Sequence, residues 1–284
     1  MTTDPVMFFL CGPPKSGTTW LQLMLDGHPA VNCAGEGHLT DWVIAPLRKL
    51  LMDYNEQLER NNALIYRERA SHTGFSEGDF KDITRFIVDQ RFARIRPRKP
   101  DAVALGDKTP NYAYAMGLLS AIYPICRFVF LVRDPRDSAV SMFHQTRRLE
   151  DSHTGRLYEH DDEIFEGYLR KWVEVNRLYL RHRAAHPGVV CHVRYEDLVA
   201  DAPAALRPVF EFLGVAADAG ILERCAEAGR FETLSGGRAR GRADNRSFFR
   251  RGEAGAWRTE LGGRAAAFVT DEVAALMAEF DYRA

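Results

Sequence analysis

The sequence lacks a charge imbalance, a cysteine framework and any long apolar run. Its 38 Lys and Arg residues are balanced by 39 Asp and Glu residues, which gives a formal net charge of −1 at pH 7. Net charge therefore indicates neither nucleic acid nor an acidic membrane as a partner, and any basic site must be local. The five cysteines are widely scattered without a C-x-x-C pair, which is typical of a protein in a reducing cytoplasm.

Signals for targeting, membrane insertion and metal binding are also missing. No apolar run approaches the roughly 20 residues that span a bilayer, and residues 1–5 carry no signal-peptide pattern. No spaced Cys/His cluster is present, so no metal is implied. A chain of 284 residues is long enough for one large α/β domain and too short for two comfortable ones. We therefore expect one domain over residues 1–284, soluble, cytoplasmic and without a membrane span.

One stretch near the start has the pattern of strand, loop and helix. Residues 6–10 form an apolar run short enough for a buried strand, and glycine and proline follow it. Apolar residues then recur at helical spacing at Trp20, Leu21, Met24 and Leu25. A loop that ends at a helix N-terminus directs backbone N–H groups and the positive end of the helix dipole at its ligand. The expected ligand is therefore an anion such as phosphate.

The loop departs at one position from the P-loop of nucleoside triphosphatases. Gly12 and Gly17, with four residues between them, are followed by Thr18 and Thr19, but the pattern requires lysine at position 18. The lysine of this loop, Lys15, lies three residues earlier. A magnesium-dependent triphosphatase would lose its contact to the β- and γ-phosphates by this change. A P-loop kinase that uses ATP and magnesium is therefore an alternative with this observation against it.

Residues 14–20, Pro-Lys-Ser-Gly-Thr-Thr-Trp, resemble the 5′-phosphosulfate loop of sulfotransferases that use 3′-phosphoadenosine-5′-phosphosulfate (PAPS). The resemblance implies an α/β fold in which helices flank a central parallel sheet, as in P-loop NTPases. It implies that Lys15 neutralises charge on the leaving phosphate oxygen. A glycine-rich turn in another Rossmann-like protein is the alternative. The resemblance also implies that the tryptophan of this loop stacks on adenine. Besides Lys15, the nucleotide contacts that it implies in the loop are Ser16, Gly17, Thr18, Thr19 and Trp20.

Glu36 and His38 are the candidate general bases. Glu36 has glycine on both sides and follows an expected short strand at residues 31–34, and loops beyond strand ends line the sites of open α/β sheets. The segment resembles the Glu-x-His region of carbohydrate and bacterial sulfotransferases, in which the glutamate is the base. Either side chain is suited to take a proton from an acceptor hydroxyl. A solvated or helix-capping carboxylate and an orienting histidine are the alternatives.

Lys108 is the candidate for stabilising the transferred group. It follows an expected strand at residues 102–105 and precedes Thr109 and Pro110. The Lys-Thr-Pro segment is similar to one in the active site of the family, where the lysine faces the sulfuryl group or the acceptor. Such a cation would offset negative charge on the sulfuryl oxygens, and a helix-terminus salt bridge is the alternative. Cytosolic family members carry their base histidine at the position of Pro110, so this departure favours Glu36 as the base.

A second nucleotide segment is expected in the middle of the chain. The apolar run at residues 127–132 is typical of a strand buried in a parallel sheet, and Asp134 and Pro135 predict a helix start. The spacing from Arg133 to Ser141 matches the 3′-phosphate segment of the family, in which the equivalents of both residues bind this phosphate. Arginine suits that role because its donors grip phosphate oxygens in pairs. In the kinase alternative, Asp134 would instead bind magnesium.

The carboxyl half supplies the remaining candidates. An expected strand at residues 189–193 leads to Tyr195 in a Tyr-Glu-Asp-Leu sequence that also occurs in the family, where the tyrosine lies near adenine. Core packing is the alternative for this side chain. The arginine-rich segment 229–258 ends in a run similar to the Arg-Lys-Gly…Gly-x-Trp segment of the family, which closes over the 3′-phosphate. The resemblance thus implies contacts to phosphate or adenine for Phe231, Arg250, Arg251 and Gly252.

Two helical regions are expected outside these motifs. Residues 39–96 carry apolar stripes at helical spacing, the first of them at Trp42, Ile44, Leu47, Leu50 and Leu51. A long amphipathic helix from Ile164 carries its apolar residues near one stripe, which indicates core packing rather than ligand contact.

These segments together predict a sulfotransferase. It would move a sulfuryl group from PAPS to a hydroxyl or amine of a small-molecule, lipid or carbohydrate acceptor and release 3′,5′-bisphosphoadenosine (PAP). A non-enzymatic nucleotide-binding module is a further alternative beside the kinase. The sequence does not specify the acceptor. Aromatic side chains that either line its pocket or pack in the core are Trp42, Phe75, Tyr112 and Tyr114.

Overall fold

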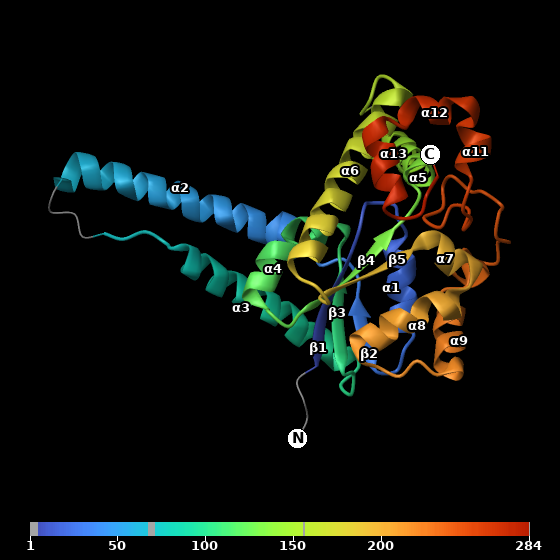
Figure 1. Cartoon of the computed structure of the whole chain (residues 1–284). Coiled ribbons are helices and arrows are strands. Elements are labelled where there is room, and N and C mark those ends of the chain that lie inside the picture. The colour runs from blue at the N-terminus through green and yellow to red at the C-terminus, as the bar shows by residue number, and fades with distance from the viewer. Residues whose placement is uncertain (1–4, 68–71, 156, 284) are drawn as a thin grey trace.

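The computed structural model describes residues 5–67, 72–155 and 157–283, and a parallel β-sheet lies at its centre (Figure 1). Within these residues, one five-stranded sheet has the strand order β2-β3-β1-β4-β5, and every neighbouring pair runs parallel. The predicted α/β fold class with a central parallel sheet is therefore confirmed. The strands are β1 Val6–Cys11, β2 Val31–Ala34, β3 Ala104–Lys108, β4 Arg127–Val132 and β5 Val190–Arg194.

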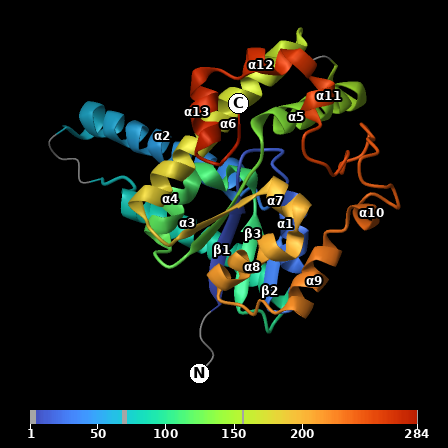
Figure 2. The same cartoon turned by 45° about the vertical axis from the view of Figure 1, so that its right-hand side comes forward.

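Helices cover both faces of the sheet, because alternate side chains of each strand point to opposite sides. Phe9 and Phe128 belong to one buried cluster, whereas Phe8 and Val129 belong to a second cluster on the other face. Residues of α3, α4, α5, α6 and α13 complete the first cluster, and residues of α1, α7, α8 and α9 complete the second (Figure 2).

The helices differ widely in length. Among those of the described residues, none is both long enough and apolar enough to cross a membrane. Their bounds are α1 Thr18–Asp26, α2 Ala45–Asn61, α3 Glu77–Ile95, α4 Met116–Ile122, α5 Pro135–Leu149, α6 Asp161–Ala185, α7 Tyr195–Ala200, α8 Ala202–Leu213, α9 Ala219–Ala228, α10 Phe231–Leu234, α11 Trp257–Glu260, α12 Ala265–Phe268 and α13 Asp271–Ala278.

Helix α5 begins where the sequence predicts. Asp134 caps it, with Oδ1 accepting a hydrogen bond from the backbone N–H of Arg136 at 2.9 Å, and Pro135 is the first helical residue. Asp201 and Gly214 likewise bound α8. Because α5 starts directly after β4, its cap also fixes the turn that joins them.

A strand predicted at residues 102–105 lies instead at Ala104–Lys108, as β3. The strand extends to Lys108 because this residue pairs with Leu10 of β1. The apolar run alone could not indicate this position, since Asp107 within β3 is polar and yet fully buried.

Helix α2 projects away from the sheet, and an extended segment runs back beside it (Figure 1). Asn55 of α2 holds this segment, because its Nδ2 donates to the carbonyl oxygen of Phe75 at 2.7 Å and its Oδ1 accepts from the Phe75 N–H at 2.8 Å. Leu51 of α2 is buried, whereas Leu50 is 63% exposed and Trp42, before the helix, is 71% exposed. The apolar stripe therefore predicted a helix correctly, but part of the stripe faces solvent.

The carboxyl ends of the strands meet at one edge of the sheet, where sites of open parallel sheets lie. Loops leave this edge after β1, β2 and β3, while α5 and α7 begin there after β4 and β5. The register places Lys108 opposite Leu10 and Asp107 opposite Ala34. An irregular segment from the carboxyl half, within residues 235–256, borders the same edge (Figure 2). Segments that are distant in the sequence are thus brought together.

Replacing Gly106 with alanine should destabilise the sheet. A Cβ atom at this position of β3 would lie 2.1 Å from Cζ of Phe8, and the Phe8 ring is fully buried. We expect the free energy of unfolding to fall by about 1–3 kcal/mol, as is typical of an overpacked core. Urea unfolding followed by circular dichroism measures this change.

Gly117→Ala is the matched control, because a Cβ atom on this exposed residue of α4 would meet no atom within 4 Å. It should raise the free energy of unfolding by roughly 0.5–1 kcal/mol, since alanine is the better helix former. Equal stability of Gly106→Ala and the wild-type protein would contradict the close packing of β3 on β1.

Candidate functional site

The loop between β1 and α1 leaves a buried polar group without a partner. Lys15 and Gly17 have φ angles of +67° and +102°, and Gly17 precedes the first residue of α1. Ser16 between them is fully buried, and its Oγ has no hydrogen-bond partner among the described residues. An unpaired buried hydroxyl is unfavourable. At the N-terminus of a helix, the missing partner is best supplied by an anion.

Lys15 lies among other cations. Its Nζ donates a hydrogen bond to Oε1 of Gln145 on α5 and lies 5.3 Å from the centre of the Phe248 ring. Burial is the main cause that lowers the pKa of Lys15 to about 8, and the positive charges of Arg148 and Arg133 lower it further. A bound anion would raise the pKa of Lys15, so this ammonium is suited to neutralising negative charge.

Lys108, Glu36 and His38 form a connected chain of charged and polar groups. Nζ of Lys108 lies 2.5 Å from Oε1 of Glu36 and donates to Oγ1 of Thr19 at 2.9 Å. The second oxygen of Glu36 lies 2.7 Å from Nε2 of His38. Burial alone would raise the pKa of Glu36, but the hydrogen bonds and charges of Lys108 and His38 outweigh it and lower the pKa below its usual value. Three of the four residues predicted as catalytic therefore lie in contact, with the carboxylate held ionised.

Asp41 and Asn111, which the sequence analysis did not single out, hold His38 in place. Nδ1 of His38 lies 3.2 Å from Oδ2 of Asp41, which also accepts from Nδ2 of Asn111 at 2.8 Å. The imidazole stacks on Trp42 with 3.9 Å between the ring centroids. The φ angle of His38 is +48°, a region that non-glycine residues rarely occupy. These contacts turn the imidazole toward Glu36, and the three-residue spacing from His38 to Asp41 was the available sequence signal.

Arg91 of α3 connects the loop of Glu36 to β3. It donates to the carbonyl oxygen of Gly35 at 2.7 Å and, through Nε, to Oδ1 of Asp107 at 3.1 Å. Tyr112 donates its hydroxyl hydrogen to the other oxygen of Asp107. Burial raises the pKa of Asp107, and the bonds from Tyr112 and Arg91 only partly oppose this effect. Because Tyr112 is fully buried, it belongs to the core rather than to an acceptor pocket.

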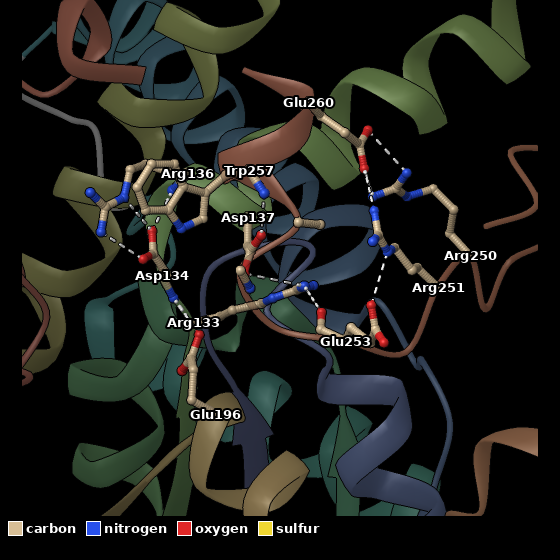
Figure 3. A network of polar contacts seen from close by, with 12 residues as sticks. Arg133, Asp134, Arg136, Asp137, Glu196, Arg250, Arg251, Glu253, Trp257 and Glu260 are labelled. Atoms are coloured by element: carbon tan, nitrogen blue, oxygen red, sulfur yellow. Dashed lines mark hydrogen bonds and ion pairs between the residues drawn. The ribbon is translucent and has the colours of Figure 1, made fainter. Parts of the chain in front are cut away.

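Arg133 follows β4 and is largely buried. Its side chain is 11% exposed, and its guanidinium carbon lies 4.0 Å from the ring centroid of Tyr195. One terminal nitrogen donates to the carbonyl oxygen of Glu253 at 3.0 Å, while Nε has no partner among the described residues. Figure 3 shows Arg133 between the β4–α5 turn and the C-terminal segment. Ser141, further along α5, lines the same cavity as Arg133.

The aromatic side chains predicted to contact adenine lie in the wall of this cavity. The rings of Trp20 and Tyr195 are 5.2 Å apart and tilted by 58°. Tyr195 also packs on the loop, because a Cβ atom at Gly17 would lie 2.8 Å from its ring. Phe231 packs on Gly252, where a Cβ atom would lie 2.4 Å from the ring. The glycines at 17 and 252 thus allow backbone and aromatic ring to approach closely.

Arg250 and Arg251 are held by carboxylates (Figure 3). Arg250 lies 2.8 Å and Arg251 3.6 Å from Glu260, and Nε of Arg251 donates to Glu253 at 3.0 Å. Glu260 also lies 2.6 Å from Nε2 of His144. Burial alone would raise the pKa of Glu260, but the hydrogen bonds from His144 and Arg250 outweigh it and lower the pKa to about 2. An anionic ligand would have to share these two guanidinium groups with the carboxylates.

A cavity of about 410 Å³ brings the predicted site residues together. Lys108 and Ser16 lie outside its wall, although Lys108 touches two residues of the wall. Gln145 and Lys171 line the cavity without having been predicted as ligands, because Gln145 is not part of the Arg133–Ser141 motif and Lys171 lies on a helix whose spacing indicates only packing. The predicted residues in the wall are Lys15, Gly17, Thr18, Thr19, Trp20, Glu36, His38, Arg133, Ser141, Tyr195, Phe231, Arg250, Arg251 and Gly252.

The carboxylate that a kinase would use for magnesium is already engaged. Asp134 caps α5, and its Oδ2 lies 2.9 Å from a terminal nitrogen of Arg136. Across the described part of the chain, no group of three or more His, Cys, Asp or Glu side chains is placed to hold a metal ion.

Known proteins of similar sequence match most of the chain. A family model with the description "Sulfotransferase family" matches residues 5–219. Protein-tyrosine sulfotransferase 2 of Gallus gallus is 25% identical over 210 residues, which cover 74% of this chain and 51% of that protein. Cytosolic sulfotransferase 17 of Arabidopsis thaliana is 24% identical over 281 residues, which cover 90% of this chain and 70% of that protein. The chain spans 51% to 65% of the length of the first curated relatives that it matches.

A solved structure of similar fold covers nearly the whole chain. Mouse sulfotransferase SULT7A1, complexed with PAP, matches with a TM-score of 0.61 and 17% sequence identity, over 98% of this chain and 86% of that chain. At this level of identity the likeness concerns the fold. It confirms the predicted P-loop-like arrangement of a parallel sheet with flanking helices.

Lys15 should titrate with a midpoint near pH 8 in the ligand-free protein. Its pKa is lowered to about 8 by burial and then by the charge of Arg148. Arg148→Met should therefore raise the midpoint toward the ordinary lysine value of about 10.4. NMR spectroscopy of the protein with ¹³C-methylated lysines measures the midpoint, and Lys15→Arg identifies the signal by its loss.

Arg170→Met is the control for the loss of one positive charge, because Arg170 is an exposed residue of α6 whose nearest acid is Glu166 at 3.6 Å. It should leave the Lys15 midpoint unchanged. A wild-type midpoint above pH 10 would mean that Lys15 is solvated, contrary to the buried position described above.

Proposed function

The chain belongs to the sulfotransferase family, and we propose that it transfers a sulfuryl group from PAPS to an acceptor hydroxyl or amine and releases PAP. The observation that carries the proposal is the ion pair of Lys108 and Glu36 beside the phosphate-binding loop. Sulfuryl transfer requires a cation to stabilise charge on the sulfuryl oxygens and a base to take the acceptor proton. This ion pair supplies both groups in one place.

The residues around the cavity fit a nucleotide with anionic groups at both ends. The hydroxyl of Ser16 and Nε of Arg133 are buried polar atoms without partners among the described residues. Both belong to segments that resemble the phosphate-binding segments of the family. We propose that Lys15 and the loop hold the 5′ end and that adenine is enclosed by aromatic rings. The residues assigned to the loop are Ser16, Gly17, Thr18 and Thr19. The rings assigned to adenine are those of Trp20, Tyr195 and Phe231. The residues assigned to the 3′-phosphate are Arg133, Ser141, Arg250, Arg251 and Gly252.

In the proposed reaction, PAPS supplies the sulfuryl group, which is bonded to its 5′-phosphate. The acceptor oxygen or nitrogen forms a bond to sulfur while the bond from sulfur to the phosphate oxygen breaks. Glu36 accepts the acceptor proton, and Lys108 stabilises the negative charge on the sulfuryl oxygens. Lys15 neutralises the charge left on the phosphate oxygen. His38, in contact with Glu36, is the second candidate for the base.

The ion pair between Lys108 and Glu36 links donor binding to the strength of the base. While Lys108 contacts Glu36, the pKa of this carboxyl group is lowered, and a carboxylate of low pKa is a weak base. When Lys108 turns to the sulfuryl oxygens, Glu36 loses its nearest cation and its pKa rises. In this proposal the base therefore becomes effective when the donor is in place.

The proposed acceptor is a small molecule, a lipid or a carbohydrate with a free hydroxyl or amine. Relatives named for protein tyrosine and for flavonol support a hydroxyl acceptor. Trp42, which is exposed and stacked on His38, would contact an acceptor that approaches the base. We further propose that residues 1–284 form one sulfotransferase domain that works in the cytoplasm, where the free cysteines would stay reduced.

Purified protein incubated with PAPS and suitable acceptors should release PAP in proportion to sulfated product. The acceptor panel comprises phenols, aliphatic alcohols, amino sugars and a tyrosine-containing peptide, and mass spectrometry identifies which of them gains a sulfuryl group. Turnover should persist in EDTA, because side chains supply the positive charge that the reaction needs.

The same assay with ATP and magnesium in place of PAPS tests the kinase alternative. Phosphoryl transfer from ATP, without PAP release from PAPS, would overturn the proposal. Binding of PAP without turnover of any acceptor would instead favour a nucleotide-binding module.

Glu36→Gln and Lys108→Ala should each lower kcat by about 10²–10⁴-fold, the loss expected for a general base or a charge-stabilising group. The affinity for PAP should stay close to that of the wild type, because PAP lacks the sulfuryl group that both residues serve. Steady-state kinetics and titration calorimetry measure the two quantities. Glu56→Gln and Lys49→Ala, on the outer surface of α2, are the matched controls and should retain wild-type kcat. Wild-type kcat in either site variant would remove that residue from the mechanism.

A further inference from the structure

Asp137 is a buried carboxylate that the proposed reaction does not use. It lies in the first turn of α5, and its side chain is fully buried. Its two oxygens accept backbone hydrogen bonds from Gly255 at 2.5 Å and from Trp257 at 2.9 Å. Figure 3 shows these bonds running from α5 to the C-terminal segment. A buried charge requires such donors, so the position of the segment and the burial of Asp137 depend on each other.

Residues 250–257, here called the C-terminal strap, lie along the β4–α5 turn. Their backbone is irregular until α11 begins at Trp257. Besides the bonds to Asp137, the strap has two contacts to the turn. The carbonyl oxygen of Glu253 accepts from Arg133 at 3.0 Å, and the guanidinium carbon of Arg136 lies 3.9 Å from the ring centroid of Trp257. Arg133 itself lies 3.9 Å from Oδ2 of Asp137, so these groups form one cluster.

The docked strap determines where its arginines lie. Arg250, Arg251 and Gly252 line the cavity just before the residues that are bonded to Asp137. Arg251 precedes Gly255 by four positions along the chain, so their Cα atoms lie at most about 14 Å apart. Anchoring at Gly255 and Trp257 therefore confines the two guanidinium groups to the vicinity of Arg133.

We propose that Asp137 is a positioning residue for the 3′-phosphate of the nucleotide. By docking the strap on the β4–α5 turn, it makes Arg133 and the strap arginines face one phosphate group. This inference rests on the proposed function, because the ligand is PAPS or PAP. Asp137 is not among the residues that line the cavity, and the 5′ loop is built from a different segment. Its effect is therefore concentrated on the 3′-phosphate.

Docking of the strap requires a carboxylate at position 137, and an amide cannot replace it. Each oxygen of Asp137 accepts one N–H group of the strap. In Asp137→Asn, the side chain keeps its size, but its NH₂ group faces one of these N–H groups, and two donors cannot bond to each other. Arg133 also loses the nearby negative charge. The substitution thus loosens the strap while it leaves the volume of the core unchanged.

The test compares Asp137→Asn with the wild-type protein by titration calorimetry with two probes, PAP and adenosine 5′-monophosphate. The second probe lacks the 3′-phosphate. We expect the Kd for PAP to rise about tenfold or more, and the Kd for adenosine 5′-monophosphate to change by less than about threefold. Asp53→Asn, an exposed aspartate of α2, is the matched control and should leave both values unchanged.

Limited trypsin digestion tests the docking of the strap without relying on nucleotide affinity. Cleavage after Arg250 and Arg251, followed by mass spectrometry, should be faster in Asp137→Asn than in the wild type, and circular dichroism verifies that the variant is folded. If Asp137→Asn does not fold, Trp257→Leu removes the stacking on Arg136 instead. It should produce the same faster cleavage and a smaller loss of PAP affinity.

The outcomes separate this inference from the proposed function. Equal changes in the two Kd values, or unchanged strap cleavage in a folded variant, would overturn the role of Asp137. Wild-type protein that binds neither PAP nor PAPS would overturn the proposed function, while faster strap cleavage in Asp137→Asn would still establish the docking. Weakened PAP binding with accelerated cleavage supports both.

Discussion

The pairing of β1 with β3 determines where the chemistry of the site lies. Their parallel register sets Lys108 opposite Leu10, two residues before the loop begins at Gly12, and the Thr109 N–H donates to the Leu10 carbonyl at 3.1 Å. The ammonium of Lys108 therefore reaches Glu36 and the start of α1 together. A shift of the register by one residue would turn Lys108 to the opposite face of the sheet and separate these groups.

The elements that were predictable rest on local chemistry. The apolar run of β4, the aspartate cap and the proline of α5 are neighbours in the sequence, so their spacing alone indicated strand, turn and helix. The bounds of β3 depend instead on pairing with β1, and the exposure of Leu50 depends on α2 leaving the body of the protein. Neither effect is visible in the residues of the segment itself.

In the candidate site, too, some features follow from the local sequence and others depend on the fold. Motifs identified the side chains around the cavity, because a phosphate loop or an arginine at a strand end has a recognisable sequence. Their partners come from far away: Gln145 is 130 residues from Lys15, and Glu36 is 72 residues from Lys108. Arg91 and Asp137 likewise bond to groups that are distant in the sequence, which is why they gave no signal of their own.

Glu36 stands between two glycines, a composition that by itself gives a backbone many conformations. Arg91 of α3 restricts this freedom by bridging the Gly35 carbonyl and the buried carboxylate of Asp107. Ordering such a backbone opposes binding by roughly 1–2 kcal/mol for each residue. In this chain that entropy is lost when the sheet and α3 assemble, so a ligand that meets Glu36 finds a loop already preorganised.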